Sequence, residues 1–382
     1  MTPRGGAGKL GGLTPWRRAL LALAGACLVA AAPVTPAPPS PSPSARKLLA
    51  PTNFPGWQTH NVTSPVVVRD PGRGVWRMFY TGSATDQVGA AAWDLWSTGV
   101  VTSRDLLAWG YPDDYAPVLV GHRFHEGELL DFSGGERPFD LAFASVTAVL
   151  RDGAQWRAWY TAWSGDERAL GAGRVEAIHF RIGQATSPDG LVWTKRPGGG
   201  ELGSALGLGA AGAIDELAAG HAAVVKAGAT YHLWYEAYDG RTWRIAHARS
   251  ADGVSWRKQG VAVEPGAEGA LDGLGARHPV VRRTTAGYEL WYEGRSAARP
   301  AFHVLRARSD DGLTWVKDPD EIALHPDPPV KDDEHIHVGS LLARPDGSLL
   351  VVFAKETANA RAATWGTLVD RSTAIYSETI RP

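Results

Sequence analysis

Hydrophobic positions recur along this chain with a period of two rather than with helical spacing. An aromatic segment in which polar and apolar residues alternate occurs in five copies: WRMFYTG (76–82), WRAWYTA (156–162), YHLWYEA (231–237), YELWYEG (288–294) and, without tyrosine, SLLVVFAK (348–355). A short apolar segment precedes each copy, beginning at Ser64, Val146, His221, His278 and Gly339. Alternation over short runs that Gly and Asp interrupt predicts β-strands throughout.

A turn motif, Ser-x-Asp-Gly-x-x-Trp, follows the aromatic segment. It occurs at 187–193, 250–256 and 309–315, with a degenerate copy at 103–109. Asp and Gly suit a tight turn in which Gly adopts a positive φ. Because a catalytic group is needed once per site, residues that recur in every repeat indicate a structural role. We therefore expect the tryptophans of this motif to be buried between neighbouring repeats: Trp193, Trp256 and Trp315.

The repeat as a whole contains four short predicted strands and is present five times. The first strand is apolar, the second carries the aromatic residues, the third runs into the turn motif and the fourth follows its tryptophan. This organisation predicts an all-β fold, a five-bladed β-propeller with four antiparallel strands per blade. A solenoid is the alternative, but its repeats are usually shorter, about 20–45 residues.

The residues before the first repeat predict export. Basic residues precede an apolar run of 14 residues, 19–32, which is shorter than the roughly 20 residues of a membrane-spanning helix. We assign 1–32 to a signal peptide, the Pro/Ser-rich segment 33–50 to a linker, and 51–382 to the propeller. The mature protein is then secreted, periplasmic or extracellular. The sequence around Cys27 also resembles a lipoprotein box, so a lipid anchor there is the alternative.

Composition narrows the class of protein. Hydrophobic residues make up 44% and charged residues 21% of the chain, as in a soluble globular protein. The formal net charge of -1 lacks the strong basic excess that nucleic-acid binding needs. Cys27 is the only cysteine, so cleavage of the signal peptide leaves no thiol. We expect a monomer with no membrane span, no nucleic-acid partner, no cofactor and no metal.

Polar residues gather at one predicted face of the propeller. Because the first two strands of a blade are antiparallel, the start of the first and the end of the second lie on the same face. An aspartate stands at an equivalent position before the first strand in four blades: Asp140, Asp215, Asp272 and Asp333. This repetition favours a turn or capping role. The same residues also surround the predicted funnel, the opening of the central channel on this face of the propeller.

Less repetitive groups lie between this aspartate and the first strand. Glu216 and Glu334 follow the aspartate only in the third and fifth blades. His221 and His278 occupy equivalent positions in adjacent blades, and Arg277 precedes His278. We expect these two histidines and the arginine to lie close together, because the first strands converge on the propeller axis.

Further candidates lie at the same face. Glu236 and Glu293 stand at the ends of two second strands. His335 and His337 are two residues apart, so both rings point to one face of a strand. Such a pair is compatible with a metal, but hydrogen-bonded histidines are the favoured interpretation.

The segment PVVxxxxxGYELWYEG (279–294), followed by RARSDDGLTW (306–315), resembles the five-bladed propellers of glycoside hydrolase family 43 and of families 32, 62, 68 and 130. The resemblance implies an oligo- or polysaccharide partner and three groups: a carboxylate base opening the first blade, a carboxylate that tunes the pKa, and a glutamic acid that protonates the leaving oxygen. The positions that match the family's carboxylate hold other residues here: Ser64, Val146, His221, His278 and Gly339.

Two hypotheses follow from this departure. In the first, the protein is a glycosidase-like enzyme whose catalytic candidates are Asp215, Glu216, Asp272 and Glu334, and whose substrate-binding candidates are His221, Glu236, Arg277, His278, Glu293 and His337. In the second, it is a non-catalytic glycan-binding or scaffold propeller, and an enzyme acting on another substrate class is a third reading. Two carboxylates about 5–10 Å apart across the funnel would favour hydrolysis. We expect the site around blades three to five.

Export is testable by N-terminal sequencing of the protein released by the producing cell. We expect the mature chain to begin near Ala32, because signal peptidase cuts after small residues, or at Cys27 if it is lipid-anchored. An intact Met1 on the exported protein would contradict this prediction.

Overall fold

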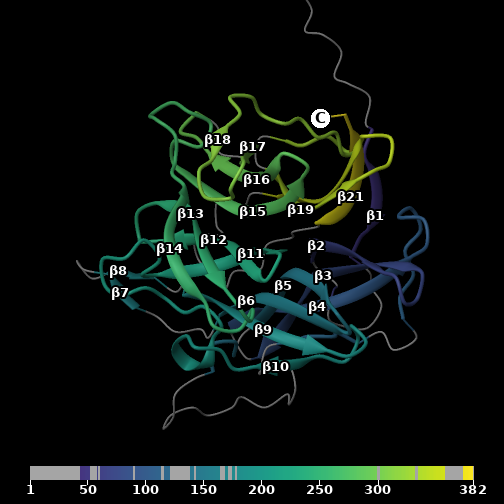
Figure 1. Cartoon of the computed structure of the whole chain (residues 1–382), viewed down its shortest axis with the longest axis horizontal. Coiled ribbons are helices and arrows are strands. Elements are labelled where there is room, and N and C mark those ends of the chain that lie inside the picture. The colour runs from purple at the N-terminus through teal and green to yellow at the C-terminus, as the bar shows by residue number, and fades with distance from the viewer. Residues whose placement is uncertain are drawn as a thin grey trace, which may run out of the picture. The chain divides into compact units, whose positions relative to one another are not determined.

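Antiparallel strands make up almost all the regular structure of the computed structural model (Figure 1). The structure describes residues 44–51, 58, 61–88, 91–112, 116–120, 138–141, 143–163, 168–170, 174–176, 179–298, 302–331, 334–357 and 373–381. The predicted signal peptide, most of the predicted linker and Asp333 lie outside these ranges. Within them the only helical element is the 3-10 turn η2 (Glu201–Gly203), and no described helix has the length and apolar character to cross a membrane.

The strands follow one another as antiparallel meanders in chain order. The first meander contains β2 (Asn61–Asp70), β3 (Val75–Val88) and β4 (Ala91–Ser103). The second contains β5 (Phe143–Asp152), β6 (Gln155–Trp163), β9 (Phe180–Ser187) and β10 (Thr194–Arg196), and the third contains β11 (Ala218–Ala227), β12 (Thr230–Tyr238), β13 (Trp243–Ser250) and β14 (Arg257–Val263). The fourth contains β15 (Gly275–Thr284), β16 (Gly287–Arg295), β17 (His303–Ser309) and β18 (Val316–Lys317), and the last contains β19 (Glu334–Ala343), β20 (Leu349–Thr357) and β21 (Ala374–Ile380). A small hairpin, β7 (Arg168–Leu170) and β8 (Arg174–Glu176), is inserted between β6 and β9.

The first strands of the meanders contact one another in a closed circuit, in the order β2, β5, β11, β15, β19 and back to β2. A five-bladed propeller requires this circuit, because the inner strands of its blades surround one axis. The predicted all-β fold with antiparallel sheets is confirmed. The first meander differs from the prediction, because beyond β4 the described residues pair with it only through isolated bridges at Gly110 and Leu119.

The first strand among the described residues completes the last meander. β1 (Arg46–Leu49) pairs with β21, and Lys47 lies opposite Tyr376. Residues 46–49, placed in the linker by the sequence analysis, therefore form a strand of that meander. Only Leu49 is buried in this strand, so no alternation of apolar and polar residues marks it in the sequence.

The second strands are buried on both faces because each lies between two neighbouring sheets. In β12, Leu233 and Tyr235 pack in a hydrophobic cluster with residues of the second meander. Trp234, between them in the chain, packs with residues of the fourth meander. Adjacent residues of one second strand therefore point into two different interfaces, one with the preceding meander and one with the following meander. This explains why large residues occupy adjacent positions in these strands.

The turn motif has the structural role that its repetition indicated. In its copy at 187–193, Asp189 accepts hydrogen bonds from the backbone N–H groups of Leu191 and Val192 at 2.8 and 2.9 Å. Gly190 has a φ of 73°, a conformation that L-residues avoid. The tryptophan then packs edge-on against an aromatic residue of the preceding meander, with ring centroids 5.7 Å apart for Trp193–Phe79, 6.1 Å for Trp256–Trp159 and 5.9 Å for Trp315–Trp234.

These tryptophans are partly rather than fully buried, and their contribution to stability is measurable. We expect Trp193→Ala to lower the free energy of unfolding by about 3 kcal/mol, the lower end of the range for Trp-to-Ala changes in protein cores, because contact with Phe79 is lost. Val192, whose side chain is 68% exposed, is the control, and Val192→Ala should change stability by less than about 0.5 kcal/mol. Equal values for the two variants in denaturant titrations would contradict the packing role.

Candidate functional site

A backbone irregularity shapes the start of each first strand. A β-bulge interrupts the pairing of the first two strands in every meander, for example between Arg277 and Val280 in β15. Three bulge residues have a positive φ, 50° at Ser64, 42° at His221 and 47° at His278. This left-handed conformation costs a non-glycine residue about 1–2 kcal/mol. Bulges of this kind re-aim side chains next to functional sites.

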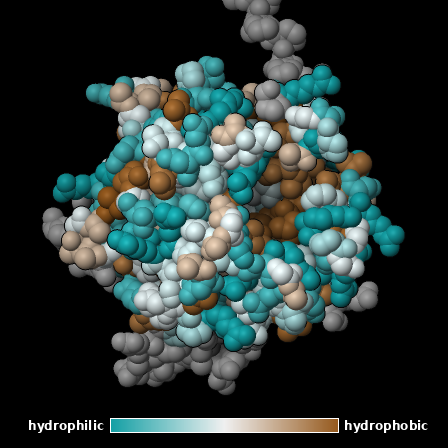
Figure 2. Space-filling model, in the orientation of Figure 1, coloured by the Kyte–Doolittle hydropathy of each residue, from teal (hydrophilic) through white to brown (hydrophobic). Residues whose placement is uncertain are grey.

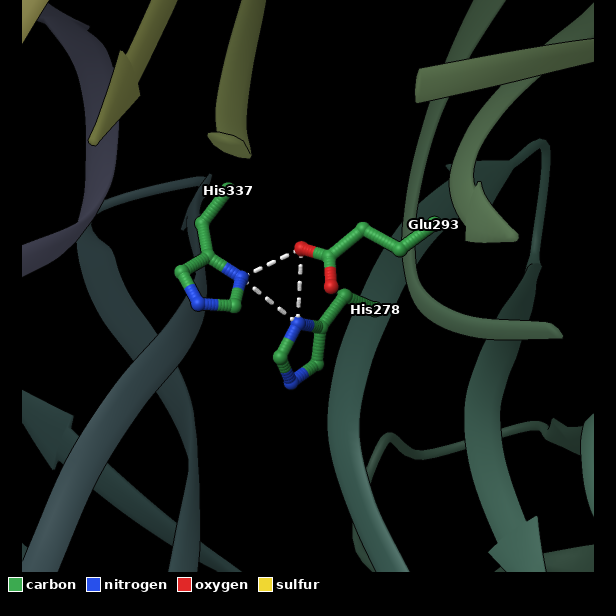
Figure 3. Close-up of side chains that lie close together, drawn as sticks. All are labelled: His278, Glu293 and His337. Atoms are coloured by element: carbon green, nitrogen blue, oxygen red, sulfur yellow. Dashed lines mark hydrogen bonds and ion pairs between the residues drawn. The ribbon is translucent and has the colours of Figure 1, made fainter. Parts of the chain in front are cut away.

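Five side chains form an alternating row of carboxylates and imidazoles, Glu236–His278–Glu293–His337–Glu356, which we call the Glu–His row. His278 Nδ1 lies 2.8 Å from Glu293 Oε1, and His278 Nε2 lies 3.4 Å from Glu236 Oε2. His337 Nδ1 contacts the same Glu293 oxygen, and His337 Nε2 lies 2.6 Å from Glu356 Oε2. Figure 3 shows the middle of the row, where His278 and His337 approach Glu293 from different strands.

Charge within the Glu–His row is strongly coupled. Burial by itself would lower the pKa of His337, but Glu293 and Glu356 outweigh it and raise that pKa to about 10. Burial likewise opposes ionisation of Glu293 and Glu356, yet the neighbouring imidazoles hold the pKa of both carboxyl groups well below its usual value. Both glutamates are therefore ionised at neutral pH, because opposite charges nearby favour the charged form.

Arg277 and aromatic rings border the row. Arg277 Nε donates to Glu236 Oε2 at 3.3 Å, and its guanidinium lies over the ring of Trp243 at 4.1 Å. Tyr238 stacks on Trp243, with ring centroids 4.5 Å apart. The rings of His221 and His278 are 4.2 Å apart. The predicted closeness of Arg277, His221 and His278 is thus confirmed.

A cavity of about 180 Å³ lies along the circuit of first strands, and residues from all five of them line it. Most of its lining residues are apolar, and Ser64, Thr147, His221 and Ser340 are polar. On the face seen in Figure 2, hydrophobic residues surround a hollow located between the labels of β19 and β2 in Figure 1. The Glu–His row is therefore next to this cavity, through His221 in the cavity wall.

Exposure divides the site into two layers. The side chains of Glu236 and Glu293 are 2% and 3% exposed, whereas those of His278 and Arg277 are 15% and 23% exposed. A ligand arriving from solvent would meet the arginine and the imidazole first. The carboxylates stand behind them and fix their orientation and charge.

The repeated aspartates have a different function. Asp215 accepts a hydrogen bond from Tyr235 Oη at 2.8 Å and forms an ion pair with Lys258 Nζ at 2.6 Å. Asp272 makes the same contacts with Tyr292 and Lys317, at 3.0 and 2.6 Å. Asp140 repeats the pattern with Tyr160 and Lys195. Each aspartate therefore links the second and fourth strands of its own meander, which supports the structural role over the catalytic one.

The two glutamates among the catalytic candidates contact other groups as well. Glu216 Oε2 accepts the backbone N–H of Gly212 at 2.7 Å. Glu334 Oε2 accepts the backbone N–H of Lys331 at 3.0 Å and pairs with Lys355 Nζ at 2.9 Å. By contrast, the structure brings together all six substrate-binding candidates, in the Glu–His row or in contact with it: His221, Glu236, Arg277, His278, Glu293 and His337.

Sequence reasoning missed Glu356 and did not list His335 among the site candidates. Glu356 lies opposite His335 in the β19–β20 register, and His335 Nε2 is 2.8 Å from His337 Nε2. Glu356 follows the copy of the aromatic segment that lost its tyrosine, and the register equivalent in the fourth meander is Arg295, so the repeat gave no sign of a carboxylate there. The signal that could have revealed it is the His-x-His pair, since two imidazoles on one strand face call for a carboxylate on the neighbouring strand.

No protein-family model and no curated protein matches the sequence. Among solved structures, a glycosyl hydrolase from Bacteroides ovatus has a TM-score of 0.55 and 14% identity, covering 84% of both chains. The β-1,2-mannobiose phosphorylase from Listeria innocua has a TM-score of 0.58 and 12% identity, covering 87% of this chain and 94% of that one. A structure of family 130 glycoside hydrolases that target β-1,2-mannosidic linkages has a TM-score of 0.55 and 15% identity, covering 84% and 85%.

At these identities the likeness establishes the fold and not the activity. The resemblance to glycoside hydrolase propellers inferred from the sequence is confirmed at that level. The chain has the fold of these enzymes, with little sequence in common.

The structural role of the repeated aspartates predicts a stability effect. We expect Asp215→Asn to lower the free energy of unfolding by about 1–3 kcal/mol, because Tyr235 and Lys258 lose a charged acceptor. Glu216→Gln, at the next residue, is a matched control and should change it by less than about 0.5 kcal/mol, since Glu216 is only partly buried. An Asp215→Asn variant with unchanged stability in thermal unfolding would restore Asp215 as a catalytic candidate.

Proposed function

We propose that this protein is a carbohydrate-active, glycosidase-like propeller whose sugar site is the Glu–His row with its border of Arg277, His221 and Trp243. The observation that carries the proposal is the position of Glu236 and Glu293 on opposite edges of the His278 ring. Glycoside hydrolysis generally uses a pair of carboxyl groups that flank the scissile bond. The fold likeness to glycoside hydrolases supports the same class of substrate.

His278 is the residue best placed to transfer a proton. Its side chain is 15% exposed, and an imidazole can both donate and accept a proton near neutral pH. Glu293, held ionised, would stabilise positive charge on that ring and on the developing oxocarbenium ion. Arg277 would donate hydrogen bonds to sugar hydroxyls, and the ring of Trp243 beside it offers an apolar surface for a sugar face.

Glycan binding without cleavage is the second candidate function. The observation in its favour is that neighbouring imidazoles lower the pKa of Glu293 and of Glu356, so neither of these carboxyl groups is set up as a protonated acid. Such a site would hold a glycan through Arg277 and the exposed imidazoles. In both cases we propose that the protein acts outside the cytoplasm, as the export pattern of residues 1–32 indicates.

Incubation of the full mature chain with a panel of aryl furanosides and pyranosides, alongside a glycan-binding assay, separates the two functions. We expect Arg277→Gln and His278→Gln each to reduce kcat/KM by at least about 100-fold, the usual contribution of a proton-transfer or orienting group. Ser64→Ala should leave activity unchanged, since Ser64 has the bulge position of His278 in the first meander but lies outside the row.

Each outcome of this assay is informative. Tight binding without turnover would establish the second function, and neither binding nor turnover would refute both. A larger loss for Ser64→Ala than for His278→Gln would place the site in the first blade, where family 43 has its base. Glu334→Gln in the same assay tests whether this sequence-based catalytic candidate has any role, since its ion pair with Lys355 gives it a structural one.

A further inference from the structure

Three ligand-type atoms converge in the middle of the Glu–His row (Figure 3). His278 Nδ1, Glu293 Oε1 and His337 Nδ1 come from β15, β16 and β19, and the two nitrogens are 2.9 Å apart. All three atoms lie within 4.8 Å of one another. The three strands therefore bring a set of possible metal ligands to one place.

Carboxylates also lie beside the remote nitrogens of both histidines. His337 Nε2 faces Glu356 Oε2 at 2.6 Å, and His278 Nε2 faces Glu236 Oε2 at 3.4 Å. When a metal ion binds Nδ1 of a histidine, a carboxylate in this place supports the ring from its Nε2 side, as in carboxylate–histidine–metal triads. An ion among the three atoms would take the place of the proton that His337 Nδ1 otherwise shares with Glu293.

Glu293 supplies an independent observation. Its side chain is 3% exposed, and its second oxygen, Oε2, is buried without a hydrogen-bond partner. A buried carboxylate oxygen without a partner is strongly unfavourable. A bound ion, or a water on that ion, would satisfy it.

We propose that His278, Glu293 and His337 bind one divalent transition-metal ion of the zinc type. Two imidazoles and one carboxylate form a ligand set that suits Zn²⁺ and its neighbours in the first transition row, and leave one position open for water. Calcium and magnesium are disfavoured, because both prefer oxygen ligands.

The neighbouring group of His335, His337 and Glu356 also contains three ligand-type atoms close together. It shares His337, whose Nε2 carries the proton that Glu356 accepts when Nδ1 binds the ion. We therefore assign Glu236 and Glu356 as outer supports that orient the two histidines, and His335 as a neighbour of the site. One ion per chain follows from this assignment.

The test uses the full mature chain, stripped with a chelator and dialysed. Added ZnCl₂ should bind with a stoichiometry of one, measured by calorimetry and by elemental analysis after gel filtration, and CaCl₂ at the same concentration should not. Glu293→Gln and His337→Gln should weaken zinc binding at least about 100-fold, because each removes a ligand. Glu356→Gln should weaken it about 10–100-fold, as loss of an outer support does.

His247→Gln is the matched control. His232 Nδ1 and His247 Nε2 form another buried histidine pair, 3.2 Å apart, that belongs to neither of these ligand groups. Zinc binding by this variant should equal that of the wild type. Far-UV circular dichroism of the metal-free proteins verifies folding, and if Glu293→Gln does not fold, His278→Gln, at a partly exposed position, carries the same test.

Three results would overturn the proposal: no zinc retained by the stripped wild type in excess ZnCl₂, zinc binding that survives Glu293→Gln and His337→Gln, or two ions per chain. The first would mean that protons alone hold the row together. The assay needs no glycan, so its failure leaves the proposed sugar site untouched. Its success would reassign His278 from proton transfer to metal binding, because the Nδ1 lone pair cannot hold a proton and an ion at once. A negative glycan assay leaves the metal site untouched.

Discussion

Buried charge that must be neutralised in place is the constraint on which the centre of this protein depends. The carboxylates of the Glu–His row are nearly inaccessible to solvent, and an uncompensated ion there would destabilise the fold by several kcal/mol. Each imidazole of the row lies between two carboxylates, and the partners come from β12, β15, β16, β19 and β20. Correct pairing therefore demands that three meanders stand in one relative arrangement, so assembly of the ring and formation of the site are the same event.

The propeller provides this arrangement through irregular backbone. A regular first strand would send alternate side chains into the neighbouring sheets, where Val224 and Val281 pack. The bulge turns His221 and His278 out of that alternation, at the energetic disadvantage of a positive φ. The histidines recover part of that free energy in contacts with each other and with Glu293. Strain at these positions and chemistry at the centre thus have one origin.

Much of the fold was readable from sequence because the propeller repeats itself: period-two alternation, the Asp-Gly turns and the interblade tryptophans all recur. The six grouped candidates were found because the antiparallel geometry of two strands fixes which ends share a face. What repetition could not reveal were the exceptions. β1 is short and half exposed. No other repeat has a carboxylate at the position of Glu356. The sequence comparison took Gly339 as the equivalent of His278, whereas in the strand pairing His337 lies opposite Ala354 as Arg277 lies opposite Glu293. A strand register is a tertiary property, and one step of it moves a side chain to the other face.

The pairing of β1 with β21 joins the two ends of the propeller unit. β1 is synthesised long before β21, so the ring can close only after β21 has been released. Contacts of such large sequence separation slow folding, because the loop between them loses entropy first. Until closure, the outer edge of β20 presents unpaired backbone groups of a kind that readily add strands from other chains. The interval between emergence of the chain and closure of the ring is the period in which the protein is most vulnerable to aggregation and proteolysis, and under the proposed export that interval falls outside the cytoplasm.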